Sequence, residues 1–439
     1  METAALADLP PGPEDIVPVA EIRRDPLGFL RDVTGRYGDV VAHRTESDLV
    51  VTLNRPELAR HVLRHRERIY VKSGTPDDAM LTPLLGRGLL TSEGEVWKRQ
   101  RRITQPAFER ERVAGLGDLI VSEAVALLER WRPARESGEP VRLDHDLSGL
   151  TLAVVARAIL GADVSGIGPR FGAAVDTVNR FMGHYDPLLP GEEGARARAE
   201  YATALRFLDG LVGMIVAGRR ASGEERDDLL GRLLEADFDA RELRDQVLTM
   251  LMAGHETTAK ALSWSTYLLD RHPDVAARLD AELDAAVGGE RLPTVADLEL
   301  APLLDRVVRE ALRLYPPVWL ISRKATVDDV VAGYAIPAGA LVCISPYLLH
   351  RHPEHWREPD RFDPDRWLDG EPETLAYLPF SDGPRRCIGE RLALLEASLV
   401  LATIRLRARV TLVPGHRVEP EALVTLRPRH GLLATISAR

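Results

Sequence analysis

A short glycine-containing run around the second of two cysteines limits this chain more than any other feature. In FSDGPRRCIGE the residues Phe380, Gly383, Arg385, Cys387 and Gly389 fit the pattern F-x-x-G-x-R-x-C-x-G, which is hard to obtain by chance. A thiolate that ligates a metal needs a backbone that can curl round the sulfur and donate N–H bonds to it, and glycine permits those dihedral angles. A neighbouring arginine can activate a thiol or bind an anionic group of a cofactor. The run therefore predicts a thiolate metal ligand, although Cys387 alone would be interpreted as a small buried hydrophobic residue.

The composition excludes several classes of protein. The chain has 439 residues, of which 45% are hydrophobic, and 57 basic against 67 acidic residues give a net charge of −10. This is the composition of a globular protein with a large core, and its acidic excess argues against a nucleic-acid partner. Two cysteines are too few for a disulfide framework, and the first 20 residues lack the basic and apolar regions of a signal peptide. Since no apolar run approaches the roughly 18 residues of a membrane span, we expect a cytoplasmic protein without one.

The hydrophobic periodicity predicts a mainly α-helical chain with minor β-structure. A β-hairpin is expected over Val40–Leu53, and helices fill most of Glu57–Leu283, interrupted by a loop over Ser73–Pro83 among others. Short strands follow Pro317 and return in the last 30 residues, so the small β-regions lie near both ends of the sequence. Because no Gly-, Ser- or Pro-rich linker divides the chain, we expect residues 1–439 to form a single domain.

A second chemical motif, AGHETT at Ala253–Thr258, lies inside a helix expected from Leu243 to Leu269. A threonine in a helix can hydrogen-bond to the carbonyl four residues earlier, here Thr257 to Ala253, and Gly254 permits a close approach by another group. Glu256 and Thr257 then form an acid and alcohol pair that can move protons. Taken alone, the hexapeptide could equally be part of a helix surface.

The two motifs together resemble those of the cytochrome P450 family, in which the threonine likewise comes well before the cysteine, as Thr257 and Cys387 do here. The resemblance implies the cytochrome P450 fold, with a long central helix over the cofactor, haem b (iron protoporphyrin IX). It makes Cys387 the proximal iron ligand, whose electron density favours cleavage of the O–O bond. Arg385 is implied to meet a haem propionate and Phe380 to pack beside the sulfur, while Glu256 and Thr257 supply protons during O2 activation.

Further cofactor contacts are implied by WKRQRR, in which Trp97 and Arg101 fall on one helical face. Without the resemblance, an amphipathic surface helix would explain this run equally well. The family places a tryptophan and an arginine at this spacing against a haem propionate, so the resemblance makes Trp97 and Arg101 cofactor contacts. Arg323, just before the second β-region, is a weaker candidate for the same role.

The run REALRLYPP contains Glu310 and Arg313 three residues apart on one helical face. This spacing recurs elsewhere in the chain, and most such pairs are surface pairs worth under about 1 kcal/mol. The PDRF run that follows, at Pro359–Phe362, distinguishes this pair from the others. The cytochrome P450 family has a glutamate, an arginine on that helix and a later arginine in a buried ion network. By that resemblance Glu310, Arg313 and Arg361 lock the cysteine loop in a structural role.

The function implied is that of a haem-thiolate monooxygenase, which inserts one oxygen atom from O2 into an apolar small molecule by hydroxylation or epoxidation. A lipid-like, terpenoid or polyketide-type substrate from secondary metabolism is expected. The chain has no flavin, nicotinamide or iron–sulfur motif, which is typical of soluble bacterial members without a fused reductase. Electrons should come from a ferredoxin or flavodoxin with its reductase, which would dock on the basic residues Lys98, Arg99 and Arg102 of a monomer.

Two other functions remain open. An enzyme of the same fold could perform oxidative cross-coupling or use peroxide, although peroxide-driven members usually lack the pair formed by Glu256 and Thr257. A haem-binding protein without turnover would not need that pair. The substrate cannot be read from the loops at about 71–96 and 170–200 that hold specificity in the family, and Phe181–Gly191 is expected to contribute to the roof of the pocket.

Overall fold

A computed structural model describes residues 8–164, 166–183, 192–370 and 376–439. Its contacts divide the chain into two compact units, each assembled from three segments. Unit 1 comprises Met1–Pro83, Arg313–Arg361 and Asp369–Cys387, and unit 2 comprises Leu84–Leu312, Phe362–Leu368 and Ile388–Arg439.

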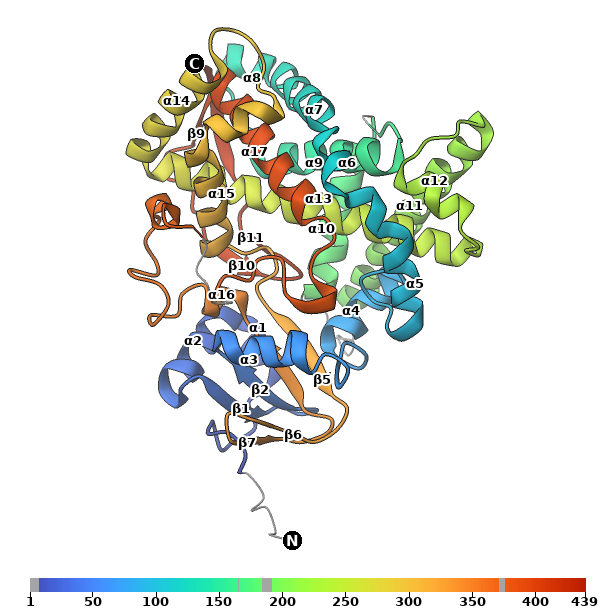
Figure 1. Ribbon diagram of the computed structural model, residues 1–439, viewed down its shortest axis with the longest axis vertical. Helices are drawn as coiled ribbons and strands as arrows, with labels where there is room; N and C mark the ends of the chain where they lie inside the picture. Colours follow the sequence, from blue (N-terminus) through green and yellow to red (C-terminus); the bar gives the residue numbers. More distant parts are fainter. Residues whose placement is uncertain (1–7, 165, 184–191, 371–375) are drawn as a thin grey trace. The chain divides into compact units, whose positions relative to one another are not determined.

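Unit 1 is built on a five-stranded sheet with the strand order β1-β2-β8-β5-β3. Its strands are β1 (Val40–Arg44), β2 (Leu49–Leu53), β3 (Tyr70–Val71), β5 (Ile321–Ala325) and β8 (Leu341–Ile344). β1 and β2 form the expected hairpin, while β2 pairs in parallel with β8, so that Val50 lies opposite Leu341. In Figure 1 the blue strands β1 and β2 therefore lie near the orange strand β5.

The remaining elements of unit 1 are short. They are α1 (Val19–Arg24), α2 (Pro26–Tyr37), α3 (Pro56–Arg60), α16 (Pro346–Leu349), the hairpin of β6 (Asp329–Val331) and β7 (Tyr334–Ile336), and α4 (Pro76–Leu85), whose last two residues belong to unit 2. The helix α4 corrects the expectation of a loop over Ser73–Pro83. Pro76 occupies the first position of the helix, where a proline is favourable. Pro83 lies in the helix near its C-terminal end, so it can disturb only the last turn.

Unit 2 is mostly helical, as the periodicity predicts. Its helices are α5 (Gly94–Thr104), α6 (Arg110–Ala114), α7 (Gly117–Arg130), α8 (Arg132–Ser137), α9 (Leu143–Leu160), α10 (Gly168–Gly183), α11 (Glu192–Ser222), α12 (Leu229–Glu235), α13 (Ala240–Arg271), α14 (Pro273–Val287), most of α15 (Pro302–Leu314) and α17 (Glu390–Arg407). Its strands are β4 (Val141–Arg142), β9 (Ala408–Leu412) and β12 (Leu433–Ala438), which form one sheet, and the hairpin of β10 (Pro420–Ala422) and β11 (Leu426–Pro428).

The longest helix of unit 2, α13, starts and ends at clear signals in the sequence. The Asp239 side chain accepts hydrogen bonds from the first turn, and the Glu242 side chain accepts one from the backbone of Asp239. This capping box starts the helix three residues before the expected Leu243. The helix ends at His272, because a residue that precedes a proline disfavours helical dihedrals and Pro273 starts α14.

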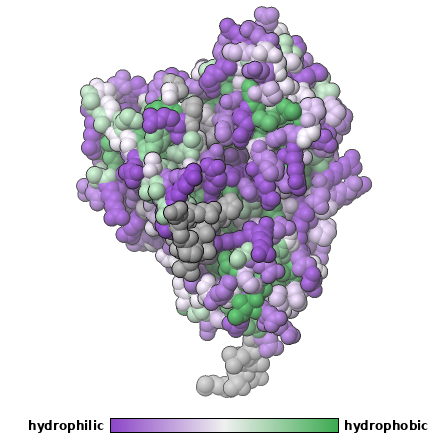
Figure 2. Space-filling model, turned by 180° about the vertical axis from the view of Figure 1, so that it is seen from behind, coloured by the Kyte–Doolittle hydropathy of each residue, from purple (hydrophilic) through white to green (hydrophobic). Residues whose placement is uncertain are grey.

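Exposed apolar surface is divided into separate areas on the face that Figure 2 shows, where hydrophilic residues surround the hydrophobic patches. Within the described residues, one helix segment, Gly194–Ser222 of α11, is long and apolar enough to cross a membrane. Core helices of water-soluble proteins satisfy the same criteria.

The buried His43 side chain should make unit 1 sensitive to acid. His43 on β1 is 4% exposed, packs edge-to-face against Phe29, and its Nδ1 has no hydrogen-bond partner among the described residues. Burial lowers its pKa to about 4 from 6.5. The unfolded chain therefore takes up a proton at a higher pH than the folded chain, and stability is lost as the pH falls from 6.5 towards 4.

At pH 5 this single residue should cost about 2 kcal/mol, or about 2 °C in Tm for a chain of this length. The check is the Tm at pH 7 and pH 5 for the native protein and for His43→Phe, which keeps a ring against Phe29. We expect the variant to lose about 2 °C less on acidification. Equal losses in the two proteins would contradict the prediction.

Candidate active site

The cysteine loop lies in unit 1, and its cysteine is exposed. Cys387 is exposed, and its backbone N–H donates to the carbonyl of Phe380 at 2.9 Å, which closes the loop on itself. Arg385 lies in a short 3₁₀ turn, Gly383–Arg385, and Gly389 caps the N-terminus of α17. The structure thus brings Phe380, Arg385 and Cys387 into one loop, while their roles stay predictions.

Two residues of this loop have left-handed backbone conformations. Ser381 has φ +62° and Gly383 has φ +71°. A Cβ on Gly383 would lie 2.0 Å from the carbonyl oxygen of Leu63, so any other residue would be both strained and blocked. Glycine at this position therefore serves a close approach between the loop and the turn that follows α3.

A buried histidine that the sequence analysis did not identify, His350, holds the segment that leads into the cysteine loop. The backbone N–H of Leu378 donates to Nε2 of His350 at 2.7 Å, and Nδ1 of His350 lies 3.0 Å from the carbonyl of Arg313. Because Nε2 accepts, Nδ1 must carry the proton and donate, so the ring is neutral. His350 thus joins the end of α15 to the chain two residues before Phe380.

The expected ion network exists in part and with a different third member. In unit 1 the fully buried Arg313 donates to the main-chain carbonyls of His350, Pro359 and Arg361 at 2.8, 2.6 and 3.0 Å. The side chain of Arg361 is 62% exposed and pairs with Glu358. The expectation that the Arg361 side chain belongs to a buried network is therefore wrong; its carbonyl accepts from Arg313, and its side chain is exposed.

In unit 2 the fully buried carboxylate of Glu310 is paired with Arg366 at 2.9 Å, and Arg366 is 10% exposed. The indole N–H of Trp367 donates to Oε2 of Glu310 at 3.0 Å, and the backbone N–H of Asp363 donates to Oε1 at 2.9 Å. Three donors thus compensate the buried charge. The sequence analysis missed Arg366, which occupies the same place in a second Pro-Asp-Arg run.

The middle of α13 carries the expected acid and alcohol pair. Oγ1 of Thr257 donates to the carbonyl of Ala253 at 2.9 Å, as predicted. At Gly254 a Cβ would lie 2.6 Å from a methyl group of Val155, so glycine permits α9 to approach α13 closely. Ala253 is exposed and Thr257 partly exposed, although most residues along this helix are buried. A strip of α13 is therefore uncovered at Ala253 and Thr257, whereas Glu256 is buried.

The two residues before Thr257 have unequal surroundings. His255 is fully buried, its ring lies edge-to-face on Phe171, and burial lowers its pKa. It is therefore a neutral packing residue. Glu256 is 5% exposed, and its Oε1 accepts hydrogen bonds from Nδ2 of Asn179 at 2.7 Å and from Oγ1 of Thr425 at 2.8 Å. No sequence signal pointed to Asn179 or Thr425.

The three remaining candidates lie in different elements. Trp97 and Arg101 are one turn apart on α5 and are both partly buried. Arg323 on β5 is 8% exposed, and its guanidinium donates to the carbonyl of Ser322 at 2.7 Å. Most of the expected roof segment lies outside the described residues, at 184–191.

Each unit, taken by itself, contains one feature that fits the haem that the resemblance implies. Of the two cysteines, Cys387 is exposed on a curled loop, whereas Cys343 is buried in β8 with its pKa raised to about 12 by burial. Only Cys387 can become a ligand without unfolding a strand. The second fitting feature is the exposure of Ala253 and the partial exposure of Thr257, in the middle of a helix whose neighbouring residues are mostly buried.

Comparisons with known proteins agree with this geometry. The model of the cytochrome P450 family matches residues 15–433. Cyclooctatin synthase of Streptomyces melanosporofaciens is 36% identical over 92% of this chain and 89% of its own length. Pentalenene oxygenase of Streptomyces avermitilis is 34% identical over 99% of this chain and 98% of its own length. A crystal structure of the cytochrome P450DA heme domain superposes with a TM-score of 0.87 at 27% identity, over 99% of this chain and 98% of that one.

Proposed function

The chain belongs to the cytochrome P450 family, and from that premise we propose that it adds one oxygen atom from O2 to a terpenoid-type small molecule. It is a cytochrome P450 monooxygenase and therefore an oxidoreductase. The observation that carries the proposed oxygen chemistry is the exposed Cys387 thiol on its glycine-containing loop. Relatives named for pentalenene and for cyclooctat-9-en-7-ol support an apolar, unsaturated substrate.

We assign the cofactor contacts as follows. Cys387 ligates the iron of haem b, and Phe380 packs beside the sulfur. The two propionates are contacted by Trp97, Arg101 and Arg385 and, more weakly, by Arg323. When bound, the haem would supply the redox chemistry that activates O2, at the position held by Cys387.

The protein's own residues move the protons of this reaction. Thr257 keeps its hydroxyl in place by donating to the Ala253 carbonyl, so its oxygen can accept a hydrogen bond from a group on the uncovered side of α13. Glu256 supplies protons to that side and recovers them from water. A reaction with O2 needs the protons that these two residues supply, whereas an enzyme driven by peroxide alone does not need them.

We propose that the whole chain acts as one domain, because the segments of the two units alternate along the sequence and one family model runs through both. We also propose that the enzyme works in the cytoplasm. Electrons would come from a ferredoxin or flavodoxin with its reductase. We propose that the enzyme works as a monomer.

The test begins with the absorption spectrum of the reduced, carbon monoxide-bound protein, where we expect the red-shifted Soret band of thiolate ligation. Apolar alkenes and unsaturated alcohols are then screened for a change of the iron spin state, and the best ligand is turned over under oxygen-18. A monooxygenase gives a product with one labelled oxygen atom. An unlabelled coupled product, turnover that needs only peroxide, or a normal spectrum without any product would each favour one of the alternative functions.

Arg102→Glu should slow reduction by an acidic ferredoxin about three- to tenfold at low salt, because exposed charges steer association. Arg99 is less suitable for this test, because its side chain already has partners within unit 2. Arg99 donates to the carbonyl of Asp237, lies over the ring of Phe238 at 4.5 Å and pairs with Glu242. It therefore holds α5 to the start of α13, whereas Arg102 is exposed.

The measurement is the rate of reduction in stopped flow at several salt concentrations. Arg68→Glu is the matched control, because it makes the same change of charge at a side chain that is 92% exposed in unit 1. We expect the control to be reduced at the native rate, and we expect both variants to bind haem normally. Equal rates for Arg102→Glu and the native protein would exclude this residue from the docking surface.

A further inference from the structure

Glu256 is held by two neutral donors that come from distant parts of unit 2. Asn179 lies on α10, and Thr425 lies just before β11 in the β10–β11 hairpin. Both bonds end on the same oxygen, Oε1, at 2.7 and 2.8 Å, and the described residues provide no hydrogen bond to Oε2. The two oxygens of this carboxyl group are therefore not equivalent.

This division suits a carboxyl group that must change its protonation state. When the proton is on Oε2, Oε1 is a carbonyl oxygen and still accepts both hydrogen bonds; when the group is ionised, Oε1 accepts them as well. Donated hydrogen bonds favour the ionised form, but a bonded cation would favour it more strongly and oppose protonation. Lys260 lies one turn along α13, Asp176 one turn back on α10 and Arg427 on β11, and none of the three is bonded to Glu256.

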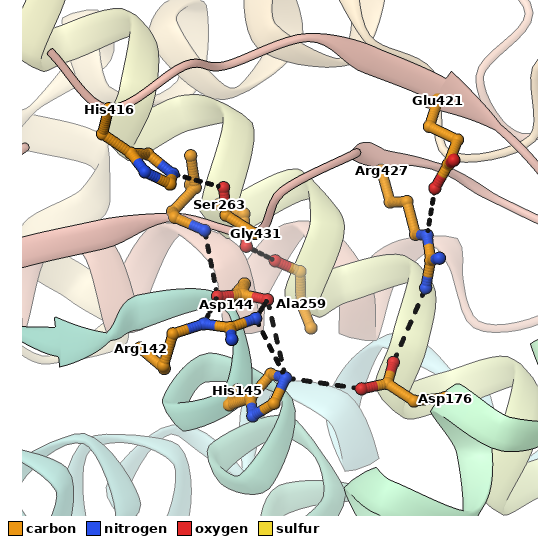
Figure 3. Close-up of polar contacts among 11 residues, drawn as sticks. Arg142, Asp144, His145, Asp176, Ala259, Ser263, His416, Glu421, Arg427 and Gly431 are labelled. Carbon is orange, nitrogen blue, oxygen red and sulfur yellow. Dashed lines mark hydrogen bonds and ion pairs between the residues drawn. The ribbon is translucent and has the colours of Figure 1, made fainter.

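The two donors are themselves held firmly. Arg427 pairs with Glu421 across the hairpin at 3.0 Å and with Asp176 of α10 at 3.6 Å (Figure 3). The indole of Trp264 on α13 donates to the carbonyl of Leu426 at 3.0 Å. The hairpin that carries Thr425 is thus fixed both to α10 and to α13, within one residue or two of the hydroxyl that reaches Glu256.

Asn179 is not placed there for stability alone. It is 3% exposed, and its Oδ1 is buried without a hydrogen-bond partner among the described residues. A buried acceptor without a partner destabilises the fold, so a leucine of similar shape would satisfy packing better. What the amide of Asn179 provides, and a leucine cannot, is the hydrogen bond from Nδ2 to Glu256.

We propose that Asn179 and Thr425 are positioning residues that hold Oε1 of Glu256 in both protonation states and leave Oε2 as the atom that exchanges the proton. Oε2 gives its proton towards Thr257 and takes another from water, so the carboxyl group is unchanged after each turnover. The inference rests on the proposed role of Glu256 as a proton source.

The first test is activity-free and measures the Tm of the haem-bound protein from pH 4.5 to 8. Thr425→Val removes the hydroxyl at constant shape, and Thr425→Ser retains it. We expect a Tm deficit for Thr425→Val that persists across this whole range, because the bond exists in both states, and no deficit for Thr425→Ser. A deficit that disappears towards acid would overturn the proposal, since the bond would then serve only the ionised form. Thr403→Val, which removes a buried hydroxyl from α17, controls for the substitution itself.

The second test measures how much of the consumed reductant appears as product and how much as hydrogen peroxide, with the best substrate from the screen. Each of Asn179→Leu and Thr425→Val should lower the product yield about threefold and raise the solvent isotope effect, which is the low end of the effect expected from the loss of one ordinary hydrogen bond. The double variant should approach Glu256→Gln, whereas Thr425→Ser and the buried-amide control Gln246→Leu should keep the native yield.

The outcomes separate the two levels of the argument. If Glu256→Gln leaves the yield and the isotope effect unchanged, the proposed proton role of Glu256 fails, whatever the stability results. If Glu256→Gln lowers the yield but Asn179→Leu and Thr425→Val do not, the positioning proposal fails and the proton role stands.

Discussion

Cys387→Ala is expected to abolish the red-shifted Soret band of the reduced, carbon monoxide-bound protein and all oxygen transfer. The variant removes the only exposed thiol, and the iron can gain no thiolate from elsewhere because Cys343 is buried in β8, where its pKa is raised to about 12 by burial. Loss of the ligand also removes the electron density that favours O–O cleavage. Spectra and product analysis after expression with ample haem provide the measurement.

Cys343→Ala is the matched control, because it removes the other sulfur from the chain. Cys343 packs with Val50 and Leu341 and lies opposite Thr52 and Ser322 in the sheet. The control should keep the red-shifted band and lose only a little stability. A red-shifted band in Cys387→Ala would remove the basis of the site assignment.

Glu310→Ala is expected to destabilise the protein by about 3–5 kcal/mol, the usual result of removing one partner from a buried pair. The substitution leaves the guanidinium of Arg366, the indole N–H of Trp367 and the backbone N–H of Asp363 without their acceptor. For a chain of this length such a loss corresponds to about 3–5 °C in Tm. Differential scanning calorimetry of the haem-bound protein measures it.

Asp305→Ala serves as the control on the same helix. Asp305 is 50% exposed and pairs with Arg309 one turn away, so its removal should cost less than about 1 kcal/mol. Similar Tm values for the two variants would show that the charge of Glu310 is not compensated in the way described. Glu310→Gln should fall between them, because an amide oxygen can still accept from Trp367.

The sequence predicted those parts of the site that lie within a few residues of one another. The loop from Phe380 to Cys387 and the pair of Glu256 and Thr257 are local patterns, and the Thr257 to Ala253 bond follows from helical geometry alone. The β1–β2 hairpin was equally local. Such features need no knowledge of the tertiary structure.

The missed residues depend on contacts between distant segments. Thr425 reaches Glu256 across 169 positions, and Asn179 reaches it across 77. Nothing in the periodicity around either residue marks it, because a buried polar residue and a surface one look alike in a short window.

The error at Arg361 has a different cause. The run PDRFDPDRW contains the tripeptide Pro-Asp-Arg twice, and spacing cannot tell which arginine turns inward. The structure buries Arg366 to 10% exposure and leaves Arg361 at 62%. Only the packing around Glu310 decides between them.

The parallel pairing of β2 with β8 has a consequence for biosynthesis. The partner of Val50 is Leu341, so the hairpin made first must wait for about 290 further residues. At ribosomal rates of about 5–20 residues per second, this takes roughly 15–60 s. During that time the inner edge of β2, with its buried Val50, Val51 and Leu53, has no strand beside it and could pair with another chain. Production of the protein should therefore benefit from slow expression at low temperature and from chaperones that cover strand edges.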